Sequence, residues 1–370
     1  MGNKFDEAKS KIEALIEKGK EYFSNNDNAN AKKQLDEAID ILNTVIKLDP
    51  NDTFAYVKRG NIYMMIKQYD AAVNDFNEAI KLDPNHAFAY RRRGNAYYRK
   101  DQPDAAISDY NEAIRLNPND AIAYNWRGEA YRRKGQFDTA IEDYSEAIKL
   151  DPNYASAYVN RGVIYGGKGQ FDDAISDYTE AIRIDPNNDF TYYVRAGIYW
   201  IKGQYNDVIN DYNEFIRLRP NDIWGYVNRG AAYRATGQIY DAMINDLSEI
   251  IRLEPNDTYV YSNRGEAYLE QGQYDEAISD FTEAISLNPV NVSAYKKRGE
   301  AYYQKGQYNN AISDYSEAIK LDSNDSLAYG YRGKVYKQLG LKKQAIQDFE
   351  KALSLDKNLD WVRQELEQIR

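Results

Sequence analysis

Apolar and small residues recur along most of the chain at a spacing of 34 residues. Nine tyrosines mark this period, and each is followed three residues later by an arginine: Tyr56, Tyr90, Tyr124, Tyr158, Tyr192, Tyr226, Tyr261, Tyr295 and Tyr329. A fixed period in this range indicates that one supersecondary unit is copied and that each copy buries its apolar face against its neighbours. The pattern therefore predicts a repeat array rather than one globular core.

Within each copy the apolar positions predict two helices. In residues 121–154 the first apolar run ends before Gly135, and a second run up to Leu150 has the i, i+4, i+7 spacing of a helix. Gly135 suits a left-handed helix end, and Asp138 is expected to cap the second helix. Pro152 stops the second helix and begins the next copy. We therefore expect an all-α protein built of helix-turn-helix units.

A glycine recurs inside each predicted first helix except one. The positions are Gly60, Gly94, Gly128, Gly162, Gly230, Gly265, Gly299 and Gly333. Because glycine inside a helix costs roughly 1 kcal/mol relative to alanine, these positions predict close packing between the two helices of a copy.

Each recurrent arginine is matched by an aspartate farther along the same copy. Asp75 follows Arg59 by 16 residues, and Asp246 follows Arg229 by 17 because one residue is inserted in that copy. The tyrosine and arginine positions lie on the stripe of the first helix that faces the second. We therefore predict an ion pair inside each of nine copies, with the planar guanidinium binding a partly buried carboxylate.

These positions together resemble the tetratricopeptide repeat (TPR) family. The family pattern is met in one copy by Tyr124, Arg127, Gly128, Tyr131, Ala140, Tyr144 and Pro152. Nine copies carry most of it, although an arginine stands where the family most often has leucine before the glycine. The resemblance implies a single TPR superhelix over residues 1–370, a right-handed α-solenoid of about ten repeats. Its expected parts are a divergent N-terminal capping repeat (5–52), nine repeats (53–359) and a C-terminal solvating helix (360–370).

The copy at residues 223–257 is irregular. Its insertion falls at Gln238-Ile239-Tyr240, and Met243 and Ile250 replace the usual alanines. We expect either a change in superhelical pitch here or a one-residue bulge in the second helix.

The resemblance also implies where a partner would bind. In the TPR family the second, fifth, sixth, ninth, twelfth and thirteenth positions of each copy line a concave groove that binds peptides or protein segments. The candidate partner-binding residues at these positions are Arg91, Arg92, Asn95, Arg99, Trp126, Arg132, Arg133, Asn160, Phe190, Tyr193, Trp200, Trp224, Asn228 and Asn263.

These residues fall into zones of different chemistry. The basic zone comprises Arg91, Arg92, Asn95, Arg99, Arg132 and Arg133, aromatic residues dominate the middle, and Glu266, Glu270 and Glu300 make an acidic zone interrupted by Lys296 and Lys297. A basic zone beside aromatic residues suits an extended segment with acidic residues followed by an apolar anchor. Two other interpretations remain open: the charged faces are simply solvated, or Trp200 and Trp224 pack between copies.

Two binding subtypes known in the family are not matched. The carboxylate clamp would begin at Arg91 and Asn95, but Trp126, Ser156 and Asn160 stand at its next positions. The asparagine ladder of the O-linked N-acetylglucosamine transferase is matched only by Asn160, Asn228 and Asn263.

Composition excludes several functions. The net charge of −10 argues against nucleic acid as the main partner, and no apolar run approaches the length of a membrane span. The chain has no cysteine, and His86 is its one histidine, so thiol chemistry, zinc-thiolate sites and multi-histidine metal sites are excluded. We expect no enzyme activity, no catalytic residues, no metal and no cofactor, and a soluble protein of the cytoplasm.

The sequence thus favours a protein-protein interaction scaffold that binds a protein or peptide ligand in its groove. The alternative is a regulatory or sensor TPR module of a larger enzyme or secretion assembly.

Overall fold

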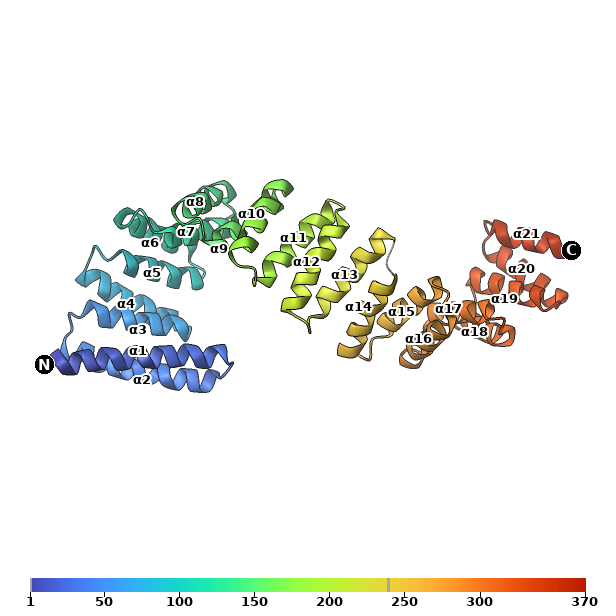
Figure 1. The fold of residues 1–370 in the computed structure, drawn as a ribbon, viewed down its shortest axis with the longest axis horizontal. Helices are drawn as coiled ribbons and strands as arrows, with labels where there is room; N and C mark the ends of the chain where they lie inside the picture. The colour runs from blue at the N-terminus through green and yellow to red at the C-terminus, as the bar shows by residue number, and fades with distance from the viewer. Residues whose placement is uncertain (1, 238–239) are drawn as a thin grey trace. The chain divides into compact units, whose positions relative to one another are not determined.

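The computed structural model describes residues 2–237 and 240–370, with side chains from residue 9 onward. Over those residues it contains twenty-one α-helices and no β-strand (Figure 1). The chain divides into two compact units, unit 1 (Met1–Thr191) and unit 2 (Tyr192–Arg370). The all-helical class predicted from the sequence is confirmed.

Ten helices lie wholly within unit 1 and form five antiparallel hairpins. They are α1 (Gly2–Ser24), α2 (Asn28–Leu48), α3 (Thr53–Met65), α4 (Tyr69–Leu82), α5 (Ala87–Arg99), α6 (Pro103–Leu116), α7 (Ala121–Arg133), α8 (Phe137–Leu150), α9 (Ala155–Gly167) and α10 (Phe171–Ile184).

Helix α11 (Asp189–Ile201) begins in unit 1 and continues into unit 2. The other helices of unit 2 are α12 (Tyr205–Leu218), α13 (Ile223–Thr236), α14 (Tyr240–Leu253), α15 (Thr258–Glu270), α16 (Tyr274–Leu287), α17 (Val292–Gln304), α18 (Tyr308–Leu321), α19 (Ser326–Gln338), α20 (Lys342–Leu355) and α21 (Asp360–Ile369).

Residues at the turns determine where the helices of each hairpin begin and end. Gly135 has a φ of +75°, the left-handed conformation expected after α7. The carboxylate of Asp120 accepts a hydrogen bond from the Ala123 amide at 3.0 Å and caps the start of α7. The prediction that Asp138 caps α8 is wrong: Gln136 is the N-cap residue and makes no side-chain cap bond. The carboxylate of Asp138 instead accepts a hydrogen bond from Lys168 of the next hairpin at 2.5 Å.

The recurrent glycines admit an aromatic ring from the second helix. A methyl group added at Gly128 would lie 2.9 Å from Cε1 of Tyr144, which is closer than carbon atoms can pack. Gly60 and Gly265 face Phe76 and Phe281 in the same way. The predicted close packing is therefore confirmed, and its main contact is a buried ring.

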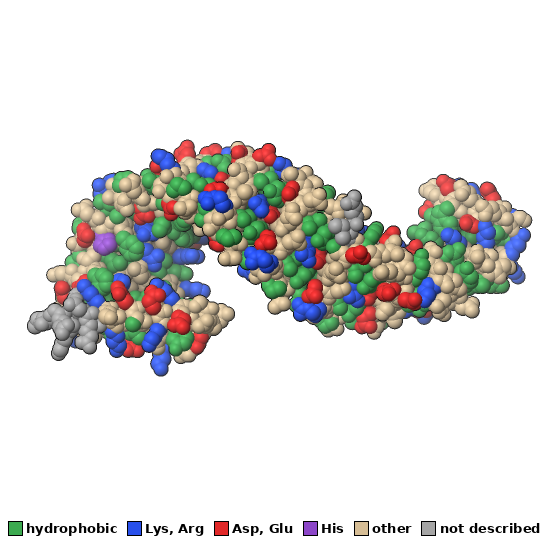
Figure 2. Space-filling model, viewed as in Figure 1, with side chains coloured by type: hydrophobic (Ala, Val, Ile, Leu, Met, Phe, Trp, Pro, Cys, Tyr) green, Lys and Arg blue, Asp and Glu red, His purple; other side chains and the backbone are tan. Residues whose placement is uncertain are grey.

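Successive first helices contact one another in unit 1: α3 touches α5, α5 touches α7, and α7 touches α9. The stack of unit 1 curves, and these helices lie on its inner side (Figure 1). Figure 2 shows a hollow on this side of unit 1. The positions that vary between copies are carried by these inner helices.

The terminal elements differ from the regular hairpins. Helices α1 and α2 have 23 and 21 residues, so both are longer than their counterparts. At the other end, Val362 and Leu366 of α21 are buried against α20. Gly330 lets the Trp361 ring approach α19, since an added methyl group there would lie 2.9 Å from Cη2 of that ring.

In the irregular copy, α14 is an unbroken helix of 14 residues, the same length as α8. Gly237 keeps the left-handed conformation of Gly135, with a φ of +68°. The expected bulge is therefore absent from Tyr240–Leu253. The insertion falls largely on residues 238–239, which lie outside the described residues, and the expected change in pitch stays a prediction.

Candidate partner-binding surface

The nine predicted Arg–Asp ion pairs are all present in the part of the chain that the structure describes. In the hairpin of α7 and α8, Nε of Arg127 donates to Oδ2 of Asp143 at 2.9 Å and Nη2 donates to Oδ1 at 2.6 Å. The aspartate side chain is 6% exposed and the arginine side chain 19%. The same two-pronged contact recurs at Arg59–Asp75, Arg93–Asp109, Arg161–Asp177, Arg195–Asp211, Arg229–Asp246, Arg264–Asp280, Arg298–Asp314 and Arg332–Asp348.

Eight of these guanidinium groups are also bonded to the preceding hairpin, which the sequence analysis missed. Nη1 of Arg127 donates to Oδ1 of Asn111 at 2.8 Å, 16 residues earlier in α6. In seven other copies Nη1 of the arginine donates to the corresponding side chain at 2.5–3.0 Å: Asn43, Asn77, Ser145, Asn213, Ser248, Thr282 and Ser316. These eight arginines therefore join neighbouring repeats, and their donors are already engaged within the protein.

Three arginines of the basic zone are paired with carboxylates. Nε of Arg91 lies 2.9 Å from Oδ2 of Asp120, and this ion pair leaves only 14% of the arginine side chain exposed. That contact has the distance of an ion pair but does not align the N–H as a hydrogen bond. Arg132 pairs with Glu129 on the same helix. Arg133 pairs with Asp101, in the turn of the preceding hairpin.

Arg133 and Glu129 are held by several contacts each. Nη1 of Arg133 donates to the Tyr98 carbonyl at 2.9 Å and to Asp101 at 3.0 Å, with its guanidinium 4.0 Å from the Tyr98 ring centre. Glu129 accepts hydrogen bonds from the hydroxyls of Tyr98 and Tyr144, both at 2.9 Å. Burial alone would raise the pKa of Glu129, but these donors and Arg132 outweigh it, so that pKa is lowered.

Arg92 and Arg99 are different, because no carboxylate within the described ranges lies at ion-pair distance from either. Nε of Arg92 donates to Oδ1 of Asn61 at 2.6 Å. Burial, followed by repulsion from Arg91, lowers the pKa of Arg92, whereas the pKa of Arg132 is raised by its hydrogen bond with Glu129. Arg99 is exposed and lies 5.8 Å from the Trp126 ring centre. Two uncompensated positive charges therefore remain on the inner helix α5.

The other predicted residues of unit 1 have mixed surroundings. Asn95 is buried and accepts a hydrogen bond from the Tyr110 hydroxyl at 2.8 Å. Trp126 is partly exposed and packs edge-on against Tyr98, with ring centres 5.5 Å apart. Asn160 donates to Oδ1 of Asn125 at 3.1 Å. Phe190 is 49% exposed.

In unit 2 the predicted aromatic residues are exposed. Tyr193 is 45%, Trp200 40% and Trp224 69% exposed. Trp200 packs edge-on against Tyr205, with ring centres 5.3 Å apart. Asn228 donates to the Trp224 carbonyl of its own helix at 2.7 Å, and Asn263 is exposed. The ring of Trp224 is thus the most accessible of the predicted aromatic residues.

The face of the molecule shown in Figure 2 carries no large patch of one charge among the described residues. Acidic and basic side chains are interspersed over the face shown in Figure 2. Across residues 2–237 and 240–370, no group of three or more histidine, cysteine, aspartate or glutamate side chains could hold a metal ion. In the same ranges no helix is both long and apolar enough to cross a membrane.

Family models match the chain over most of its length. A model described as TPR repeat matches residues 60–101, 94–135, 128–169, 265–306 and 299–340. Models described as tetratricopeptide repeat match residues 155–188, 326–359, 247–279, 12–41 and 191–222. A search of curated proteins found no match.

Several solved structures are similar to the chain. The crystal structure of MamA has 34% identity and a TM-score of 0.40, and the match covers 43% of this chain and 94% of MamA. YrrB, described as a TPR protein with an unusual peptide-binding site, has 20% identity and a TM-score of 0.41, with 50% and 95% covered. Yeast Tom70 has 17% identity and a TM-score of 0.38, with 98% and 95% covered.

Proposed function

Because the chain belongs to the tetratricopeptide repeat family, we propose that it is a non-catalytic protein-interaction scaffold whose inner first-helix surface in unit 1 binds a segment of another protein. The segment has acidic residues followed by an apolar anchor. The observation that carries this proposal is the pair of uncompensated guanidinium groups, Arg92 and Arg99, beside the partly exposed Trp126.

The ion pairs within the basic zone limit which of its arginines can bind an acidic ligand. Arg91, Arg132 and Arg133 already have carboxylate partners, so an acidic ligand would have to compete with Asp120, Glu129 and Asp101 for them. A ligand carboxylate at Arg92 or Arg99 displaces no protein carboxylate. Arginine forms strong two-pronged contacts with carboxylates, and these contacts gain strength where water is partly excluded.

Trp126 supplies the apolar part of the surface. Arg99 lies over its ring, and Tyr98 packs against its edge, so the indole is held in one orientation. Rigid aromatic side chains and arginines are the residues that most often dominate interface energies. An apolar side chain that follows the acidic residues would contact this ring.

The test is binding of a labelled peptide that carries an acidic run followed by phenylalanine. Arg99→Glu should weaken binding at least about tenfold, which corresponds to about 1.4 kcal/mol. Arg115→Glu is the matched control, since this substitution makes the same change of charge at an exposed position of α6. The ion pair of Arg115 is with Glu112, on the same helix. Raising the salt concentration should also weaken binding to the unaltered protein.

Equal affinity for the peptide in the Arg99→Glu and Arg115→Glu proteins would refute the proposed site. Equal binding of a peptide in which lysines replace the acidic residues would refute the proposed chemistry of the ligand.

A further inference from the structure

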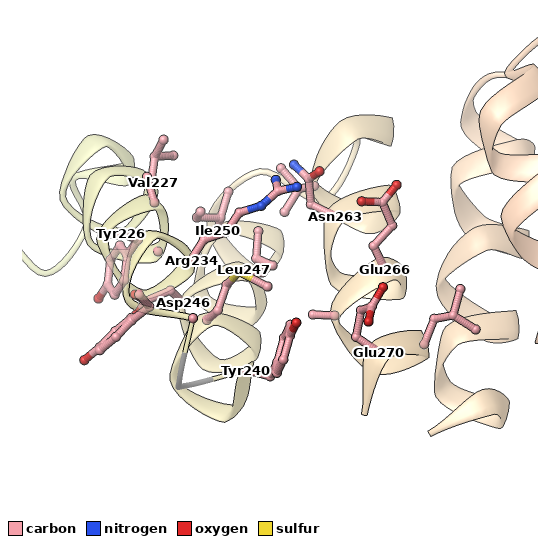
Figure 3. Close-up of a pocket in the computed structure, with 18 of the residues that line it drawn as sticks. Tyr226, Val227, Arg234, Tyr240, Asp246, Leu247, Ile250, Asn263, Glu266 and Glu270 are labelled. Carbon is pink, nitrogen blue, oxygen red and sulfur yellow. The ribbon is translucent and has the colours of Figure 1, made fainter. Parts of the chain in front are cut away.

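Unit 2 contains a cavity of about 460 Å³, and Asn263 is the one candidate binding residue among the described side chains that line it (Figure 3). It is lined by α13, α14 and α15, with Lys297 of α17 at its edge. Its apolar wall includes Met243, Leu247, Ile250 and Leu269. A volume of several hundred Å³ with a mainly apolar lining is the usual scale of a ligand site.

The cavity has a local cause in the sequence. In the regular copies the recurrent glycine of the first helix is covered by a tyrosine or phenylalanine ring, as Gly265 is by Phe281. In the irregular copy Leu247 stands at the ring position. A methyl group added at Gly230 would have no neighbour closer than 4.0 Å. The missing ring therefore leaves space between α13 and α14.

The rim of this space is charged. Glu266 and Glu270 lie one turn apart on α15, and no cation in the described residues is at ion-pair distance from either. Arg234 of α13 is directed toward Asn263, which lies one turn before Glu266 on α15 (Figure 3). Lys297 is paired with Glu300 at 3.3 Å. The rim therefore has two carboxylates, Glu266 and Glu270, that form no ion pair within the described residues.

Three carboxylates act on the Lys297 ammonium at this rim. Burial by itself would lower the pKa of the Lys297 ammonium, but Glu300, Glu266 and Glu270 outweigh burial and raise that pKa. A second positive charge placed between Glu266 and Glu270 would be stabilised in the same way.

We propose that this cavity receives an aromatic side chain that a partner protein carries beside a lysine or arginine. The ring occupies the space that a tyrosine or phenylalanine fills in the regular copies, and the neighbouring cation binds Glu266 and Glu270. An apolar cavity of about 150 Å³ already accommodates benzene, so the volume here admits a larger ring with its attached chain. The exposed ring of Trp224 and the exposed Val227 extend the apolar surface from this cavity along α13.

This inference rests on the proposed function only in that both assign a protein segment to the first-helix surface. Its residues belong to unit 2, whereas the proposed acidic-segment site belongs to unit 1. The two sites therefore take segments of opposite charge and can be tested separately.

The experiment uses phenethylammonium as the probe and phenylpropionate as its control of opposite charge, with ligand-observed NMR on the full chain. Phenethylammonium should bind the unaltered protein, and phenylpropionate should bind at least about tenfold more weakly. Leu247→Phe restores the ring of the regular copies and should abolish binding while raising the melting temperature of unit 2. Glu270→Gln, which keeps the shape of the rim, should weaken binding.

Three results would overturn the inference: no binding of phenethylammonium, unchanged binding after Leu247→Phe, or tighter binding of phenylpropionate. A rise in melting temperature would show that the Leu247→Phe protein is folded, so that loss of binding could not be attributed to a folding defect. Arg99→Glu should leave phenethylammonium binding unchanged. A failed acidic-peptide experiment with intact phenethylammonium binding would therefore refute the unit 1 site alone.

Discussion

The regular hairpin of α7 and α8 and the irregular hairpin of α13 and α14 share one polar contact and differ in one apolar contact. Both have the buried Arg–Asp pair, Arg127–Asp143 in the first and Arg229–Asp246 in the second. Tyr144 covers Gly128 in the first, whereas no ring of the described residues lies within 4.0 Å of a methyl group added at Gly230 in the second.

The ion pair joins repeats to one another, because its guanidinium also bonds the preceding hairpin. Losing it would affect an interface on which neighbouring repeats depend for stability. The ring fills space inside a single hairpin, so it can be replaced at a local cost. The comparison therefore indicates where this architecture tolerates change and where a binding cavity can arise.

The largest expected effect is on the shared contact. Asp143→Ala and Asp246→Ala should each lower the free energy of unfolding by about 3 kcal/mol, since each leaves a partly buried arginine without its carboxylate. Urea unfolding with hydrogen exchange of the affected hairpin measures this. Glu142→Ala, at an exposed neighbouring position, is the control and should change the free energy by less than about 0.5 kcal/mol. If Asp143→Ala lowered the free energy of unfolding no more than Glu142→Ala, the Arg127–Asp143 pair would stabilise the protein no more than a solvent-exposed ion pair does.

The next effect should have opposite signs in the two hairpins. Gly128→Ala should destabilise by about 1–3 kcal/mol, because the added methyl group would lie 2.9 Å from the Tyr144 ring. Gly230→Ala should stabilise by up to about 1 kcal/mol, because alanine favours the helix and its methyl group meets only open space. Thermal unfolding of both variants measures the sign and size of the two changes in stability. Two changes of the same sign would contradict the difference in packing.

A smaller effect is expected from exchanging the ring itself. Phe281→Leu should create a similar cavity beside Gly265 and cost about 1–2 kcal/mol. Leu247→Phe should stabilise the irregular hairpin by about 1 kcal/mol through filling its cavity. Crystal structures or unfolding measurements of both variants test this exchange. If Leu247→Phe destabilised the protein, the space beside Gly230 would be too small for a ring.

The smallest effect should be at the exposed contacts between hairpins. Asp138 accepts a hydrogen bond from Lys168 in the regular region, and Asp241 accepts one from Gln271 in the irregular region. Asp138 is 87% exposed, so Asp138→Ala should change the free energy of unfolding by less than about 0.5 kcal/mol. Asp241→Ala should behave alike. A large loss at only one of them would show that the two regions also differ at their surface.

Much of the fold could be predicted because it depends on contacts repeated at a fixed period. The two helices of each copy, the left-handed Gly135 and the pairing of Arg127 with Asp143 all follow from recurring positions. The cap predicted at Asp138 was wrong because an acidic residue in the first turn of a helix is compatible both with capping and with a surface ion pair. Local sequence does not distinguish these two roles.

The candidate surface could be predicted only in part. Family positions placed Arg91, Arg92 and Arg99 on one face, but only the structure showed that Asp120 neutralises the first of them. The cavity beside Gly230 had a visible signal, since Leu247 interrupts a series of rings at that position. The sequence did not show that this leucine leaves a cavity, because the contact between ring and glycine is seen only in the structure.

The sequence by itself determined the repeated architecture of this protein, because periodic apolar residues, glycines and paired charges specify the same hairpin wherever they recur. Only the tertiary structure decided which charges remain uncompensated and where a missing ring leaves space. The compensation of a charge depends on side chains from neighbouring hairpins, and the space depends on the contact between a ring and a glycine within one hairpin; the repeat pattern encodes neither contact.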